Sequence, residues 1–101
     1  MERIIINAET TNAPELIGSE KQIAWATDLR NGFFETAEKF INDIARKYEE
    51  ANCMDEFKTG MDIWFEAVTN VVKHDRCRFW IDRRNWLDMI DEEIDKINNN
   101  K

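Results

Sequence analysis

Glycine and proline are scarce in this chain, with three Gly and one Pro among 101 residues. A turn-rich β architecture and a disordered chain both use more of these residues, so their scarcity argues against both classes. No apolar stretch approaches the ~20 residues that a membrane-spanning helix needs. The sequence therefore predicts a helical protein without a membrane partner.

Residues that carry catalysis or bind metals are also few. His74 is the single histidine, so no histidine pair can hold a metal and no base is evident beside a nucleophile. Asp75 and Cys77 lie close to it, but three mixed ligands without a fourth are a weak metal pattern, and a helix-end histidine is the better interpretation. There is no glycine-rich phosphate loop. The sequence predicts no enzyme, no metal and no cofactor.

The two cysteines, Cys53 and Cys77, are too far apart for the CxxC spacing of a metal or redox site. The N-terminus shows no apolar leader. Together these features predict a cytoplasmic protein in which both thiols are reduced.

Apolar residues at helical spacing are abundant and define a first helix. Ser19 and Gln22 form a capping-box pattern directly after Gly18, so the helix should begin at Glu20 and run to about Ala51. The Asn31-Gly32 pair leaves open whether this helix is one rod or is kinked or split. The core-facing stripe consists of Ile23, Ala26, Leu29, Phe33, Ala37, Phe40, Ile44 and Tyr48.

Two further apolar stripes follow. One begins after Asn52 and ends near residue 73, and the other covers a short segment around residues 79–81 and a terminal helix from Trp86, with residues 83–85 as a joint. The fold class is therefore all-α, a three- to four-helix bundle in one domain. Residues 1–18 are an extended arm or loop, and residues 19–98 form the bundle. The Ile4–Ile6 run either lies on the helices, which we favour, or pairs with another copy of the chain.

Charge is strongly acidic and unevenly distributed. The 21 acidic and 14 basic residues give a net charge of −7, which opposes non-specific attraction to nucleic acid or anionic membranes. A surplus of carboxylates is explained by solubility alone, but it also suits a protein that imitates nucleic acid in a basic groove. One basic island, residues 73–84, separates two acidic regions.

The basic island is a candidate nucleic-acid site. Its arginines alternate with aromatic residues, the composition that grips phosphates and stacks bases. The alternative is that the aromatics are core and the arginines pair with carboxylates, which the net charge favours. The nucleic-acid interpretation requires the four guanidinium groups to converge on one face. The arginines are Arg76, Arg78, Arg83 and Arg84, and the aromatics are Phe79, Trp80 and Trp86.

Two residues of the first helix stand out from its pattern. Arg30 falls within the apolar stripe, where a charge needs a partner, and we predict a structural ion pair with Asp82. Trp25 lies on the flank of the helix beside Lys21. It either packs under the N-terminal arm, the interpretation we favour, or is a partly exposed aromatic beside a cation, which is typical of a binding hot spot.

Two blocks of the sequence resemble a group of small uncharacterised bacterial proteins, many of them from phages and other mobile elements. The first block runs from Pro14-Glu15-Leu16 through Gly18–Ala26 to a basic residue at Arg30, and the second is Phe79-Trp80-Ile81-Asp82-x-Arg84. The resemblance implies no particular activity. It implies that the two blocks meet in the fold.

Three functions are compatible with these features. The first is a non-catalytic protein-binding module, a phage or mobile-element factor that inhibits a host protein such as a CRISPR-type defence nuclease through an acidic surface. The second is a nucleic-acid-binding module that uses the basic island. The third is a small accessory protein that works as a homo-oligomer. The binding residues predicted for the first two functions are Lys21, Trp25, Arg76, Arg78, Arg83 and Arg84.

Overall fold

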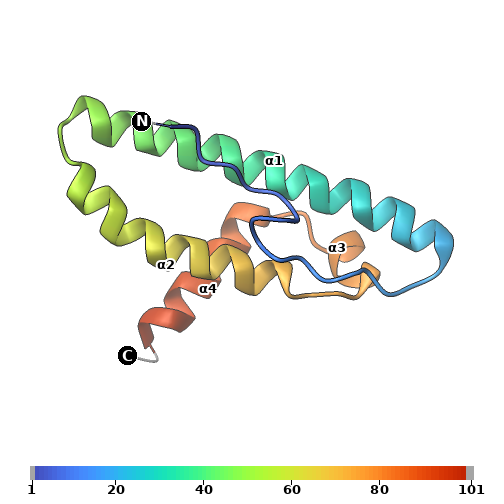
Figure 1. Ribbon diagram of the computed structural model, residues 1–101. Coiled ribbons are helices and arrows are strands. Elements are labelled where there is room, and N and C mark those ends of the chain that lie inside the picture. The colour runs from blue at the N-terminus through green and yellow to red at the C-terminus, as the bar shows by residue number, and fades with distance from the viewer. Residues whose placement is uncertain (1, 100–101) are drawn as a thin grey trace.

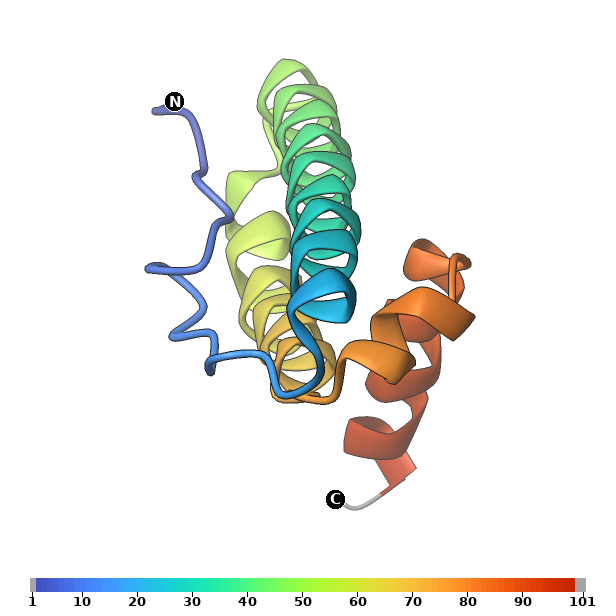
Figure 2. The same ribbon diagram turned by 90° about the vertical axis from the view of Figure 1, so that its right-hand side faces the viewer.

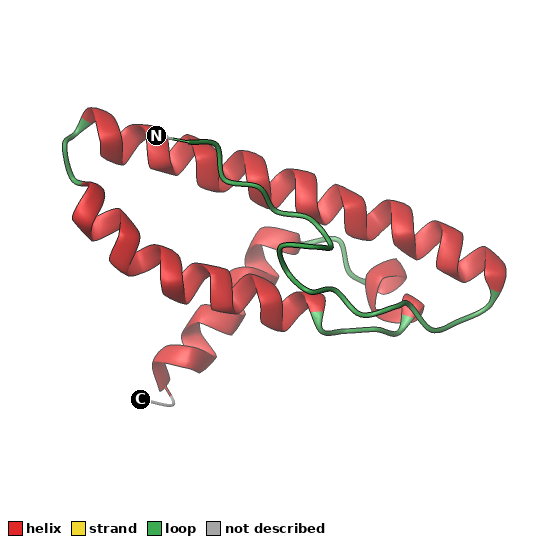
Figure 3. Cartoon of the chain, in the orientation of Figure 1, coloured by secondary structure: helices red, strands yellow, loops and turns green. Residues whose placement is uncertain are grey.

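The structure is a computed structural model that describes residues 2–99, and it confirms the predicted all-α bundle (Figure 1). Every regular element in this range is a helix, and the remainder is loop (Figure 3). Across the same residues, no helix combines the length and the apolar character needed to cross a bilayer. The four helices are α1 (Glu20–Glu50), α2 (Met54–Val72), α3 (Cys77–Asp82) and α4 (Trp86–Asn99).

Helix α1 begins with the capping box that the sequence predicts. The Gln22 amide N–H donates to Ser19 Oγ at 3.2 Å, and the Ser19 N–H donates to Gln22 Oε1 at 3.1 Å. These two bonds satisfy donors that the first turn of a helix leaves without a partner. The helix then runs unbroken past Gly32, which settles the open question in favour of one rod.

The chain forms three layers (Figure 2). Helices α1 and α2 form an antiparallel hairpin, with the N-terminal segment on one side and α3 with α4 on the other (Figure 2). The joint at residues 83–85 lies where the sequence predicts it, between the end of α3 and the start of α4. The largest fully buried side chains come from all four helices: Trp80, Phe33, Ile90, Val68, Val71, Val72 and Cys77.

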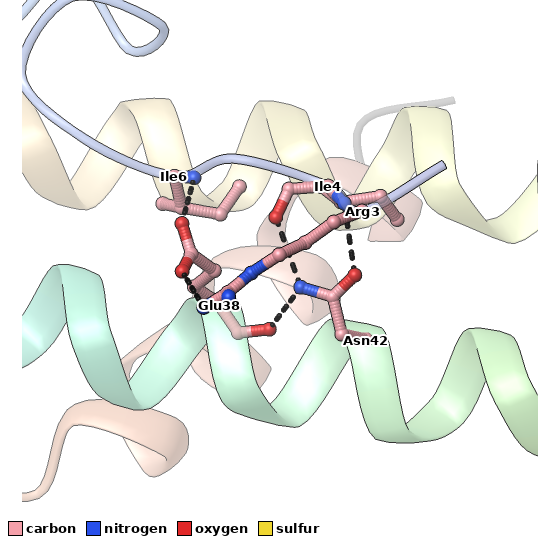
Figure 4. A network of polar contacts seen from close by, with 5 residues as sticks. All are labelled: Arg3, Ile4, Ile6, Glu38 and Asn42. Atoms are coloured by element: carbon pink, nitrogen blue, oxygen red, sulfur yellow. Dashed lines mark hydrogen bonds and ion pairs between the residues drawn. The ribbon is translucent and has the colours of Figure 1, made fainter. Parts of the chain in front are cut away.

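Two polar residues of α1 hold the N-terminal arm in an extended conformation (Figure 4). The Asn42 side chain pairs with both main-chain groups of Ile4, accepting from its N–H at 2.8 Å and donating to its C=O at 2.9 Å. Glu38 accepts from the Ile6 N–H at 2.9 Å and from Arg3 at 2.7 Å. The apolar side chain of Ile6 is buried and belongs to the hydrophobic core. The arm therefore lies on the helices of its own chain, as we favoured.

Attachment of the arm to α1 should weaken at low pH, because Glu38 is one of the residues that hold it. The pKa of Glu38 is lowered by the hydrogen bond from the Ile6 N–H and, to a smaller degree, by Arg3. A lowered pKa means that the stability contributed by this carboxylate is present above its ordinary value of 4.5 and is lost as the pH falls through the folded value. We expect the Ile6 amide resonance to move towards its unfolded position in that range. The variant Glu38→Gln keeps an acceptor but cannot titrate, so an Ile6 titration that persists in it would contradict this account.

A main-chain link joins the loop before α1 to the start of α3. The Ile17 N–H donates to the Asp75 carbonyl at 2.7 Å, and the Cys77 N–H donates to the Ile17 carbonyl at 3.2 Å. Gly18 follows directly, and a Cβ atom at this position would lie 2.9 Å from Cys77 Sγ. The loop can approach α3 this closely because Gly18 has no side chain.

The two glycines inside helices should respond in opposite ways to replacement by alanine. A Cβ on Gly32 would lie 2.9 Å from the Trp86 ring, whereas a Cβ on Gly60 would meet nothing within 4 Å. Alanine stabilises a helix interior by about 0.5–1 kcal/mol relative to glycine, so Gly60→Ala should raise the free energy of unfolding by that amount. Gly32→Ala should lower it by about 1 kcal/mol because of overpacking. Urea denaturation measures both, and equal gains would contradict the packing described for Gly32.

Candidate functional site

An exposed tryptophan on α1 meets an arginine that follows α3. Trp25 is 51% exposed, and the Arg84 guanidinium lies over its ring at 5.9 Å from the centroid. The interpretation that Trp25 packs under the arm is wrong, because half of the side chain is exposed and the group that lies over its ring is Arg84, which does not belong to the arm. Since Trp25 and Arg84 belong to the two sequence blocks, the blocks do meet in the fold.

The exposed surface continues onto α4. Leu87, in the first turn of α4, is 38% exposed. It lines a shallow depression of about 260 Å³ together with Arg84 and Asp88. We name the surface formed by Trp25, Arg84 and Leu87 the Trp25 patch. Lys21 is exposed one helical turn before Trp25, so a cation flanks the patch at the start of α1.

The other arginines of the basic island have different surroundings. Arg78 pairs with Asp82 at 3.2 Å along α3. The Arg83 guanidinium lies 4.8 Å from the centroid of Phe79, while Arg76 is exposed at the N-cap of α3. The four arginines thus have different neighbours. Arg78 lies against a carboxylate, Arg83 and Arg84 lie over aromatic rings, and Arg76 stands at the start of α3.

The aromatic residues of the basic island are engaged inside the fold. His74 stacks on Phe79 with centroids 3.7 Å apart and planes 7° apart, so one face of Phe79 is covered by His74 while Arg83 lies over the ring. Trp80 is fully buried. Partial burial lowers the pKa of His74, which disfavours a charge on its ring. Base stacking needs an open aromatic face, and in this region Trp25 supplies the most exposed one.

The predicted ion pair between Arg30 and Asp82 is wrong. Arg30 Nη1 donates to the Pro14 carbonyl at 2.8 Å, and Asp82 pairs with Arg78. Asp82 pairs with Arg78 because a partner four residues away on the same helix needs no tertiary alignment. Burial lowers the pKa of Arg30, but a main-chain carbonyl of the adjoining loop accepts from it instead of a carboxylate.

Helix α4 presents an acidic face that the sequence reading overlooked. Its four exposed carboxylates stand at spacings i, i+3, i+4 and i+7, which place them on one side of the helix. The face is about 10 Å long at 1.5 Å per residue. It begins at Asp88, in the depression that Leu87 and Arg84 line. The α4 acidic face consists of Asp88, Asp91, Glu92 and Asp95.

Neither a metal-binding cluster nor a matching known protein accompanies this geometry among the residues described. Within residues 2–99, no group of three or more histidine, cysteine and carboxylate side chains is arranged to hold a metal ion. No protein-family model, curated protein or solved structure matches the chain.

Proposed function

We propose that the protein is a non-catalytic protein-binding module whose anchor is the Trp25 patch. The observation that carries this proposal is the half-exposed Trp25 ring beneath the Arg84 guanidinium. Tryptophan and arginine are the residue types most enriched among interface hot spots. A ring held by a cation on one side is already oriented, so less side-chain freedom is lost when a partner covers it.

The α4 acidic face supports a finer form of the same proposal. A row of four carboxylates adjoins the patch at Asp88, and the whole chain carries a net charge of −7. Complementary charge accelerates encounter and selects a basic partner. In this form the protein is a phage or mobile-element factor that occupies the nucleic-acid groove of a host protein such as a defence nuclease.

Affinity capture with the tagged 101-residue chain tests the proposed function. Host lysate is passed over the protein with and without nuclease treatment. We expect a stoichiometric protein partner that survives the nuclease. Recovery of nucleic acid alone, lost on nuclease treatment, would instead favour a nucleic-acid-binding function carried by the arginines of the basic island. A mass that rises with protein concentration in light scattering, with no partner captured, would favour a homo-oligomer.

The finer form has its own test in a competition experiment. The captured partner is mixed with a fluorescent DNA duplex, and the protein is added. We expect the wild type to release the duplex and a variant with all four carboxylates of the α4 acidic face changed to amides to release much less. Equal release by both would remove the acidic face from the account while leaving the Trp25 patch untouched.

A further inference from the structure

A second apolar surface lies on the α1–α2 hairpin, away from the Trp25 patch. Helices α3 and α4 leave the end of the hairpin where α1 passes into α2 uncovered (Figure 1). Near this end, a depression of about 170 Å³ opens between the two helices. Phe40 and Tyr48 are each 38% exposed there. We name this depression the hairpin groove, and its walls include Phe40, Ile44, Tyr48, Phe57, Gly60 and Trp64.

The groove has a rigid wall. Phe40 stacks on Trp64 across the two helices, with centroids 6.2 Å apart and planes 22° apart. About two helical turns further along, Tyr48 packs on Phe57 at 5.8 Å. These ring pairs fix the spacing between α1 and α2, so the groove is preformed and an occupant need not open it.

Gly60 lies in the wall of the groove, at a position where neither the backbone conformation nor the packing of this chain requires a glycine. Glycine in a helix interior costs about 0.5–1 kcal/mol relative to alanine. No glycine among residues 2–99 has positive φ, and a Cβ on Gly60 would meet nothing within 4 Å. The missing side chain therefore accommodates no neighbour of this chain. It leaves room for the main chain of another molecule to approach α2 closely.

The dimensions of the groove limit its occupant. An apolar cavity of ~150 Å³ accepts a benzene-sized group, so a groove of about 170 Å³ suits one large apolar side chain. A second copy of the chain is a poor occupant, because a standard interface buries ~800 Å² on each partner. The rings of Phe40 and Tyr48 each have less than half of their surface exposed, so they offer on the order of 100 Å² apiece.

We propose that the hairpin groove binds a short amphipathic helix of the protein partner, with one Leu-, Ile- or Phe-sized anchor in the groove and its main chain against Gly60. Recognition of an apolar helix face by a groove between two helices is a recurrent mode of peptide binding. The inference rests on the proposed function in one respect, that the occupant belongs to another protein. It adds a second contact site and the chemistry of the segment that fills it.

A displayed library of random 15-residue peptides, panned on the 101-residue chain, tests this inference. We expect enriched peptides with apolar residues at helical spacing. Gly60→Leu should lower their affinity at least tenfold, because its side chain fills the open space. Thr59→Leu is the matched control: it places the same leucine side chain one residue away at an exposed position, and its affinity should stay within twofold of the wild type.

Three results would overturn the inference. They are the absence of enriched peptides with helical apolar spacing, equal binding by Gly60→Leu and wild type, and self-association of the wild type that Gly60→Leu abolishes. The last result, measured by sedimentation equilibrium, would assign the groove to a second copy. Trp25→Ala should bind the peptides normally, so failure of the Trp25 patch and failure of the hairpin groove are distinguished.

Discussion

Replacing Trp80 with alanine is expected to lower the free energy of unfolding by about 3–5 kcal/mol. The side chain is fully buried and meets Phe33 edge to face, with centroids 5.4 Å apart. Its Nε1–H donates to the His74 carbonyl at 2.9 Å. Alanine would leave a cavity between α1 and α3 and would remove the donor from that carbonyl. Since a small domain has about 5–15 kcal/mol in total, the variant should be marginally folded.

Thermal unfolding followed by circular dichroism measures this effect. A loss of 1 kcal/mol shifts Tm by about 4–8 °C in a domain of this size, so Trp80→Ala should unfold at least about 12 °C below the wild type. Trp80→Phe retains a ring and should lose less. Trp25→Ala is the matched control, because it removes the same side chain from the surface. Equal Tm values for the two alanine variants would contradict the packing described for α3.

Replacing Trp25 with alanine is expected to weaken partner binding by about 2–4 kcal/mol, which corresponds to roughly 30- to 900-fold in Kd. The ring is 51% exposed, so the fold loses little when it is removed. Its loss also leaves the Arg84 guanidinium without the surface that orients it. Titration calorimetry with the captured partner measures the change in Kd.

The control for this prediction is Ile5→Ala. Ile5 is 47% exposed, close to the value for Trp25, but it belongs to the arm on the other side of the hairpin (Figure 2). Its removal should change Kd by less than about threefold, since surface contacts outside a hot spot contribute little. A larger loss for Ile5→Ala than for Trp25→Ala would move the interface to the arm.

The helices were predictable because their signals are local. The Ser19–Gln22 capping box starts α1, and the apolar periodicity carries it to Glu50. The joint at residues 83–85 was recognisable because the apolar stripe is interrupted there. Whether α1 breaks at Gly32 could not be decided from the sequence, since the Trp86 ring that packs against Gly32 is more than fifty residues away along the chain.

Contacts made through the main chain were not predictable. The partner of Arg30 is the Pro14 carbonyl, and Ile17 is joined to the start of α3 by main-chain bonds. Neither contact has a side-chain signature, so a helical wheel shows that Arg30 needs a partner but not which one. For the arm, one signal was present: Asn42 is a poor helix former inside a long helix, and its amide is the group that holds Ile4.

The candidate site was partly predictable. Trp25 was identified as lying off the apolar stripe, and the two sequence blocks were expected to meet in the fold, but the neighbour favoured for Trp25 was the N-terminal arm and not Arg84. The α4 acidic face could have been found from the spacing of Asp88, Asp91, Glu92 and Asp95, because i, i+3, i+4 and i+7 define one helical face. Glu93 pairs with Lys96 at 3.3 Å.

The central claim, that the Trp25 patch anchors a protein partner, is tested most directly by one affinity capture. Wild type, Trp25→Ala and Ile5→Ala are used side by side on nuclease-treated host lysate, after each variant has been shown to unfold at a similar Tm. We predict that wild type and Ile5→Ala retain the same stoichiometric protein and that Trp25→Ala does not. Equal retention by all three would contradict the claim.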